Sequence, residues 1–221
     1  MLYTLQTVRD NLRNRQGKRV FYLGKGDTLT SEARDFLTRE RIEILPAEQA
    51  RPGRYRLLNG GYIEEKPEHM THLNAEVLVE KNHPRILFRG AVDSLEAELL
   101  LCCANATGQI RNQLEEALRH SRTLLRNEVL DEAVKAEALG GMDEKALRER
   151  SHRPQDFYGQ PHFMPEPTDS PLLLQVNKAR CAARAAELYA VAAFPSGRED
   201  LLRAFNRLSS FLYLIMIQLK K

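Results

Sequence analysis

The chain has 221 residues, 43% of them hydrophobic, which is typical of one globular domain or of one domain with a small addition. Its 33 basic and 30 acidic residues leave a formal charge of only +3, which by itself does not indicate a nucleic-acid partner. The N-terminus lacks the apolar stretch of a signal peptide, and the most apolar run, residues 211–217, is too short to span a bilayer. We therefore expect a cytoplasmic protein with no membrane or nucleic-acid partner and with reduced cysteines.

Short elements alternate in residues 1–66, in the order strand, helix, strand and hairpin: 19–23, 30–40, 42–45 and 54–64. Thr30 or Ser31 precedes the helical stretch and is a suitable N-cap. The hairpin is expected to turn at Asn59-Gly60-Gly61, because asparagine and glycine tolerate the positive φ of tight turns. This region predicts a small α/β appendage.

From about residue 70 the apolar residues recur at steps of three and four, which predicts helices. The first is expected to open at Gly90-Ala91-Val92-Asp93, the second to stop at Gly140-Gly141, and the third to begin at Ser170-Pro171. A fourth follows the break at residues 195–197, while a short helix (143–150) and a proline-rich loop (152–171) lie between the second and third. Residues 67–221 therefore predict a mainly α domain, an antiparallel helix bundle.

The third helix carries the sharpest local signal. Arg180, Arg184 and Glu187 each follow directly after an alanine of the apolar stripe and so lie at the edge of the buried face. Two arginines one turn apart repel, and guanidinium groups suit phosphate or carboxylate oxygens, so an anionic ligand would explain the pair. An Arg184–Glu187 surface pair beside one solvated arginine is the alternative, and the spacing leaves both open.

Three weaker signals accompany this one. Asn206, Ser210 and Tyr213 share a face of the last helix, where they would contact a ribose or base, or form interhelical hydrogen bonds. Asp93 in a first helical turn is favoured by the helix dipole alone. Thr71 and Lys81, near the expected helix start, are groups that can hold phosphate.

Metal ligands are poorly supported by the residue spacing. His69 and His72 lie three residues apart but have no Cys-x-x-Cys partner, and Cys102-Cys103 lie on an apolar helix where core packing is the expected role. We predict no metal site. The segment 24–28 (GKGDT) lacks the spacing of a phosphate-binding P-loop.

Three segments, taken in order, resemble the ATP:cob(I)alamin adenosyltransferases of the PduO/EutT type, and most closely the ethanolamine-utilisation branch: THLNAEVLVEKNHPRILFRGAVDSLEAE, KARCAARAAE and FNRLSSFLYLIMI. The resemblance covers about residues 70–219. It implies a ferritin-like helix bundle that forms a homotrimer with intersubunit active sites. It also implies transfer of the 5′-deoxyadenosyl group of ATP to the cobalt of cob(I)alamin, with Mg²⁺ as cofactor and a Co(II) reductase as partner.

The resemblance further implies roles for individual residues. Arg184 would hold phosphate oxygens, and Asp93 would pair with Arg180 across a subunit boundary to order the ATP site. The ligand-binding residues would be Thr71 and Lys81 on the triphosphate, Glu187 on ATP or Arg184, Asn206 on the nucleotide, and Phe163 beneath the corrin.

This sequence departs from the family in two places. The His…Cys-Cys-x-x-Cys motif of the ethanolamine branch is absent, and Ser210 stands where the wider family has an aspartate. A non-catalytic corrinoid-binding protein, or an assembly protein of a bacterial microcompartment, is therefore an alternative, as is a small nucleic-acid-binding module. Association of a cytoplasmic enzyme with such a microcompartment is a further expectation.

Overall fold

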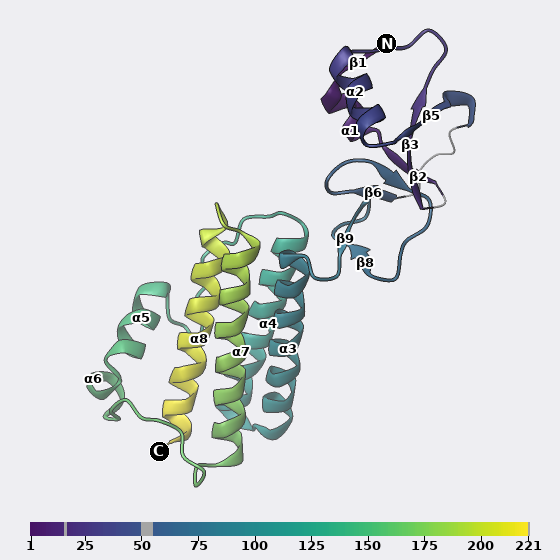
Figure 1. Ribbon diagram of the computed structural model, residues 1–221. Coiled ribbons are helices and arrows are strands. Elements are labelled where there is room, and N and C mark those ends of the chain that lie inside the picture. The colour runs from purple at the N-terminus through teal and green to yellow at the C-terminus, as the bar shows by residue number, and fades with distance from the viewer. Residues whose placement is uncertain (16, 50–54, 221) are drawn as a thin grey trace. The chain divides into compact units, whose positions relative to one another are not determined.

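The computed structural model describes residues 1–15, 17–49 and 55–220, and the chain divides into two compact units, Met1–His83 and Pro84–Lys221 (Figure 1). The sequence places the boundary at 66/67 instead. The difference consists of the strands β8 (Met70–His72) and β9 (Val77–Glu80), which pair with each other and, through β9, with the sheet of the first unit. No helix of the described residues is long and apolar enough to cross a membrane.

The first unit begins with elements that the sequence pattern does not predict. They are the strands β1 (Leu2–Tyr3), β2 (Arg13–Arg15) and β4 (Thr28–Leu29) and the helix α1 (Leu5–Asp10). β1 pairs in parallel with β4, and the Thr4 side chain caps α1 by accepting from the Thr7 N–H. Each element is too short for hydrophobic periodicity to reveal it.

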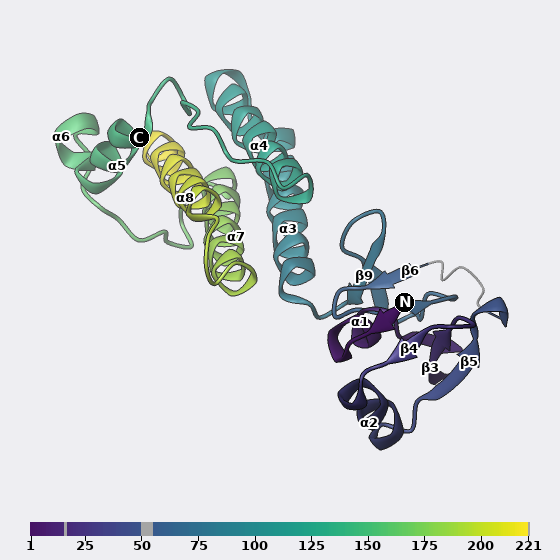
Figure 2. The same cartoon turned by 90° about the horizontal axis from the view of Figure 1, so that it is seen from above.

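The predicted strand–helix–strand unit is confirmed. β3 (Lys18–Leu23) pairs in parallel with β5 (Glu43–Pro46), and β4 and α2 (Ser31–Arg39) connect them (Figure 2). Thr30 is the N-cap of α2, with its hydroxyl accepting from the Ala33 N–H, and a 3-10 turn, Ala47–Gln49, follows β5. The small core of this part is formed by Val8, Phe21, Ala33, Phe36, Leu37 and Ile42.

The predicted hairpin is also present, as β6 (Tyr55–Leu57) and β7 (Tyr62–Ile63), although Arg54 lies outside the described residues. Gly61, with φ of 86°, lies so close to the Leu12 carbonyl that a Cβ atom would be 2.4 Å from its oxygen. Only glycine fits there. Seven of the described strands form a sheet in the order β5-β3-β2-β7-β6-β9-β8, and β1 and β4 form a separate pair.

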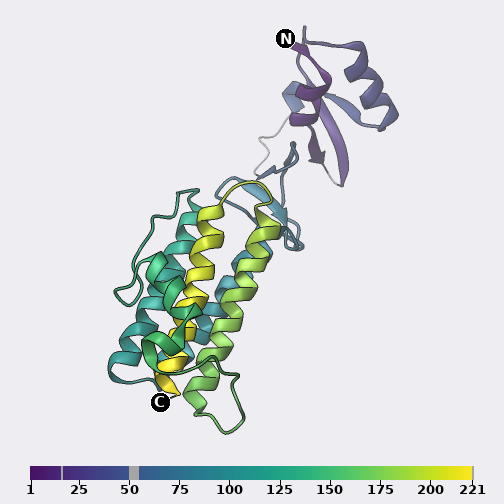
Figure 3. The same ribbon diagram turned by 90° about the vertical axis from the view of Figure 1, so that its left-hand side faces the viewer.

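Four long helices dominate the second unit and lie side by side (Figures 1 and 3): α3 (Pro84–Asn105), α4 (Gly108–Val129), α7 (Pro171–Ala193) and α8 (Glu199–Leu219). The start of α7 is as predicted, with the Ser170 hydroxyl accepting from the Leu173 N–H and Pro171 at the first helical position. Proline is favoured there because its missing N–H would have no helical partner.

The predicted start of the first long helix is wrong. α3 begins at Pro84 rather than at Gly90, so Asp93 lies well inside the helix and not in its first turn. Proline is favoured at the first position of a helix, so Pro84 indicates the true start, which the spacing of apolar residues does not. Residues 70–80, expected to approach a helix start, are the strands β8 and β9 instead.

The predicted end of the second long helix is also wrong. α4 ends at Val129, where Asp131 adopts a φ of 55° and the Glu132 N–H donates to the Asn127 carbonyl. Gly140 and Gly141 lie further on, in a turn bridged by Leu139 and Met142. The helix α5 (Glu144–His152) is confirmed, and α6 (Pro154–Tyr158) lies within the segment expected to be a loop.

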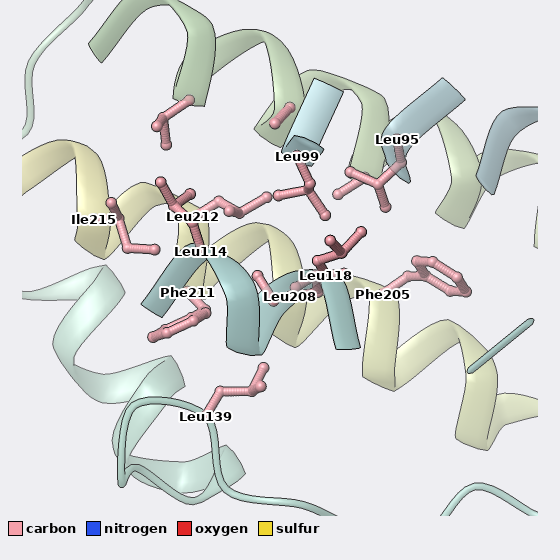
Figure 4. Packing of buried hydrophobic residues seen from close by; sticks show 14 of the residues in the cluster. Leu95, Leu99, Leu114, Leu118, Leu139, Phe205, Leu208, Phe211, Leu212 and Ile215 are labelled. Carbon is pink, nitrogen blue, oxygen red and sulfur yellow. The ribbon is translucent and has the colours of Figure 1, made fainter. Parts of the chain in front are cut away.

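Leucine, isoleucine and phenylalanine side chains from α3, α4 and α8 point toward one another in the core of the second unit (Figure 4). Glu128, with 0% of its side chain exposed, lies at one end of this core. Its carboxylate accepts from Arg85 Nε at 2.6 Å and Arg89 Nε at 2.7 Å. A buried carboxylate needs such partners, so this network ties the start of α3 to the end of α4.

Candidate functional site

The alanine stripe of α7 is buried as predicted: Ala179, Ala183, Ala186 and Ala190 are all 0% exposed. Alanine side chains allow neighbouring helices to approach closely, and α3 and α8 both pack on α7. Arg180 and Arg184 follow two of these alanines and emerge at the edge of the seam. Their backbone positions are therefore fixed by packing.

Both arginines line one cavity of about 330 Å³ within the second unit. The remaining lining residues come from the end of α5, the following loop and α8: Ser151, His152, His162, Ser209, Ser210 and Tyr213. Arg180 is half-buried and Arg184 exposed. The wall thus offers two guanidinium forks, several hydroxyls and imidazole groups, and no carboxylate among its described residues, a donor set suited to phosphate oxygens.

Arg180 is oriented from its own helix. Its Nε and a terminal nitrogen donate to Asn177 Oδ1 at 3.2 and 3.0 Å, and the same terminal nitrogen lies 3.8 Å from Cys181 Sγ. These neutral partners hold the guanidinium without cancelling its charge, so the cavity remains electropositive.

A histidine and a tyrosine close another side of the cavity. His162 Nε2 lies 3.2 Å from the His152 carbonyl oxygen and must donate to it, while Nδ1 lies 2.9 Å from the Tyr213 hydroxyl. Burial raises the pKa of Tyr213, against the opposing effects of a backbone hydrogen bond from Phe163 and the charge of Arg180. Tyr213 is therefore a neutral hydroxyl at physiological pH, able to donate to His162 or to a ligand.

Phe163 lies next to the cavity but is not among its lining residues. Its ring stacks on Tyr213, with 6.1 Å between centroids, and the Lys220 ammonium lies 5.3 Å from its centre. Lys220 also pairs with Asp169 and lowers the pKa of that carboxyl. The proline-rich loop that carries Phe163 is thereby held against α8.

Glu187 and Asn206 meet each other rather than the cavity. The Asn206 side-chain amide donates to Glu187 Oε1 at 3.0 Å, joining α7 to α8, and both side chains are half-buried. Asn206 therefore forms the interhelical hydrogen bond that the sequence analysis considers, and its contact with a nucleotide stays a prediction. Ser210 donates to the Asn206 carbonyl at 3.2 Å while also lining the cavity.

Asp93 is exposed on α3, and none of the described contacts of Arg180 involves it. Their predicted pairing crosses a subunit boundary, so a single chain leaves it a prediction. Thr71 lies on β8 opposite Val79, and Lys81 follows β9 with its ammonium 3.1 Å from Glu68 Oε1. Both belong to the first unit and are described apart from the arginine cavity.

Sequence reasoning missed Ser151, His152 and His162. His162 stands beside Phe163 in the motif HFMPEP, and the five prolines in residues 152–171 are the sequence signal that this segment is ordered. The buried Cys102 and Cys103 have the predicted core role, and burial raises the pKa of Cys102 to about 12. No group of three or more histidine, cysteine or acidic side chains placed for a metal ion occurs in the described part of the chain.

Residues 61–219 match the family model described as cobalamin adenosyltransferase. Over 160 residues, the chain is 30% identical to the corrinoid adenosyltransferase EutT of Salmonella typhimurium and 29% identical to that of Escherichia coli K12. Each match covers 70% of this chain and 60% of the relative, so the chain matches less than two thirds of the length of these proteins.

The fold is similar to that of solved structures. One variant of the PduO-type ATP:corrinoid adenosyltransferase from Lactobacillus reuteri, complexed with cobalamin and ATP, matches with a TM-score of 0.56 and 19% identity. The match covers 69% of this chain and 90% of that one. A second variant complexed with the same ligands matches with a TM-score of 0.57 and 18% identity, covering 69% of this chain and 87% of that one.

Proposed function

The chain belongs to the cobalamin adenosyltransferase family, and from this premise we propose that it transfers the 5′-deoxyadenosyl group of ATP to the cobalt of cob(I)alamin. The products are adenosylcobalamin and triphosphate. The observation that carries the proposal is the pair Arg180 and Arg184, one turn apart on a close-packed seam and lining one hydroxyl-rich cavity.

The reaction forms a bond between cobalt and the 5′ carbon of ATP while the bond from that carbon to the triphosphate oxygen breaks. Cobalt is the nucleophile, so the chain needs no nucleophilic side chain of its own. Its task is to position both substrates and to stabilise the negative charge that develops on the leaving triphosphate. Arg184 would face the phosphate oxygens beside Arg180, and the hydroxyls of Ser210 and Tyr213 would complete the donor set by exchanging their bonds to the Asn206 carbonyl and His162 for bonds to phosphate.

We propose that Mg²⁺ enters this site as a companion of the nucleotide. No carboxylate lines the described part of the cavity, and Mg²⁺ is commonly held through substrate phosphates with few protein ligands. When bound, it would neutralise part of the triphosphate charge. Thr71 and Lys81 are proposed from the family resemblance alone to supply a hydroxyl and an ammonium to a triphosphate.

The remaining proposed ligand-binding residues are not among those that line the arginine cavity. Glu187 and Asn206, hydrogen-bonded to each other, would contact ATP at the edge of the seam. Phe163 would form an apolar wall beneath the corrin, since it lies on the loop that closes the cavity and packs on Tyr213.

We further propose an antiparallel, ferritin-like bundle that assembles as a homotrimer with active sites between subunits. A cavity of about 330 Å³ is too small to enclose a nucleotide and a corrin together. Large apolar side chains are exposed on the outer faces of α3 and α7, with Leu101 54%, Leu188 71% and Val191 52% exposed. Burial of this surface against a second copy, with Asp93 of one subunit meeting Arg180 of another, would complete the site.

The biological setting follows from the EutT relatives. We propose that the protein is cytoplasmic, serves ethanolamine utilisation, receives its reduced substrate through a Co(II) reductase and associates with a bacterial microcompartment. A non-catalytic corrinoid-binding or assembly protein is the rival function, and the assay below separates the two.

An anaerobic assay with ATP, Mg²⁺ and reduced cobalamin tests the proposal by following adenosylcobalamin formation. Arg184→Ala should lower the rate by about 10²–10³-fold, as the loss of one oriented donor to a developing charge does in other enzymes. Arg119→Ala, an exposed arginine on α4, is the matched control and should keep the wild-type rate. Absence of adenosylcobalamin with the wild-type protein would favour the non-catalytic rival.

A further inference from the structure

The first unit contains a cavity of its own, about 380 Å³ in volume, to which no role has been assigned above. Three arginines line it from three different elements: Arg9 on α1, Arg13 on β2 and Arg19 on β3. Its volume lies in the range of small-molecule sites. No carboxylate is found among its described lining residues.

Aromatic rings orient two of these guanidinium groups. The Arg9 guanidinium carbon lies 5.1 Å from the centre of the Phe36 ring. Arg13 lies 5.5 Å from the Tyr22 ring and 5.4 Å from the Tyr62 ring, so it is held between two aromatic side chains. Stacking on a ring face orients a guanidinium without neutralising its positive charge.

The third arginine is only weakly compensated. Arg19 pairs with Glu40 at 2.9 Å, but 53% of the arginine side chain and 36% of the glutamate side chain are exposed. Such surface pairs contribute about 0–1 kcal/mol, so an anion of higher charge can compete for the guanidinium. Three guanidinium groups at one cavity therefore give a positive field that a ligand carrying more than one negative charge would relieve.

The cavity also has an apolar part and a rigid rim. Leu12, Leu57 and Phe36 contribute hydrocarbon surface, and the Gly60-Gly61 turn lies directly against the backbone of residues 9–12. A Cβ atom on Gly60 would lie 3.1 Å from the Arg9 carbonyl oxygen, so the turn and α1 are closely fitted. A ligand that complements both parts is an organic phosphate, with its phosphate on the arginines and its carbon portion on the apolar surface.

We propose that this cavity binds a small organic phosphate, independently of the adenosyl transfer proposed for the bundle. Phosphate is favoured over a single carboxylate because its three oxygens and double charge match several guanidinium forks at once.

Phenyl phosphate is a suitable probe, with benzoate and inorganic phosphate as comparisons. Calorimetric titration would use the full chain carrying Arg180→Ala and Arg184→Ala, so that the bundle cavity cannot contribute. We expect phenyl phosphate to bind more tightly than either comparison. Arg13→Gln should weaken its binding at least tenfold, and Arg13→Lys should fail to restore it because lysine lacks the planar fork.

Arg34→Gln, which removes an exposed arginine of α2 outside the cavity, is the matched control and should leave binding unchanged. Circular dichroism of each variant would verify that it is folded. Equal losses in the Arg13 and Arg34 variants, equal binding of benzoate and phenyl phosphate, or absence of phenyl phosphate binding would each overturn the proposal. None of these results depends on adenosyl transfer, which the cobalamin assay measures separately.

Discussion

The two units of this chain differ in whether they bury charged and polar side chains. The buried polar or charged residues within the described part of the chain, among them His120, Ser121 and Glu128, all lie in the helical unit. In the first unit, Arg9 is exposed and Arg13 half-buried, and both stack on aromatic rings. A large helical core can offset the cost of burying a paired charge, whereas the small core of the first unit cannot.

Removal of the buried charge of Glu128 is the strongest test of this difference between the units. Glu128→Ala would leave Arg85 and Arg89 facing a cavity without their carboxylate, and we expect a loss of about 3–5 kcal/mol in the free energy of unfolding. Urea denaturation measures this. Glu132→Ala, which breaks the exposed pair with Arg126, should cost about 1 kcal/mol or less. Similar losses of unfolding free energy in both variants would mean that burial of Glu128 adds nothing to its contribution to stability.

The alanine seam offers a second test. Ala183→Leu adds volume where no space exists and should lower the free energy of unfolding by about 1–3 kcal/mol. It should also reduce adenosyl transfer, because the neighbouring Arg184 would shift. Ala138→Leu, at an exposed position, should change stability by about 0.5 kcal/mol or less. A stable and fully active Ala183→Leu protein would show that the seam does not fix the arginines.

The buried histidine predicts a pH dependence. Burial lowers the pKa of His120, against an opposing hydrogen bond and charge from Glu137 and the charge of Glu116. The unfolded chain therefore takes up a proton near its ordinary pKa of about 6.5 while the folded chain still resists it, so stability falls as the pH drops below that value. For one proton the slope is at most about 1.4 kcal/mol per pH unit.

Urea denaturation at pH 7 and pH 5 should show a shallower loss for His120→Gln than for the wild type. His69→Gln, at an exposed position of the first unit, is the control. An unchanged slope in His120→Gln would exclude His120 as the source of the pH dependence.

The smallest effect is expected in the first unit. Tyr62→Leu removes one of the two rings beside Arg13 and should weaken phenyl phosphate binding by about two- to fivefold, equivalent to a cation–π contribution of about 0.5–1 kcal/mol. Tyr62→Phe keeps the ring and should bind as the wild type does. If Phe and Leu weaken binding equally, the hydroxyl and not the ring is the important group.

The contrast between the units also explains what the sequence could predict. The sequence predicts the cap of α7, its alanine stripe and the arginine pair because all three are local patterns within one helix. The cavity of the first unit joins three short elements, and strand pairing such as that of β2 with β7 brings together residues far apart in the chain. Local patterns do not contain this information.

The errors at the ends of α3 and α4 have a similar origin. Gly90 and Gly140-Gly141 predict helix boundaries because glycine commonly interrupts helices. The actual boundaries are set by Pro84 and by the left-handed Asp131. In the bundle site, His152 lies at the end of α5, and His162 reaches the cavity from a loop whose course depends on contacts with α8, which no periodicity reveals.

The close packing of α7 determines where this site can be redesigned. A helix fixed along its whole buried face offers no freedom to accommodate a larger or differently shaped ligand than the proposed corrinoid, so changes in selectivity must come from elsewhere. The loop that follows α6, residues 159–170, reaches the same cavity at His162 and is held by Tyr213 and Lys220. Libraries aimed at a new substrate should therefore vary this loop and leave the helix untouched.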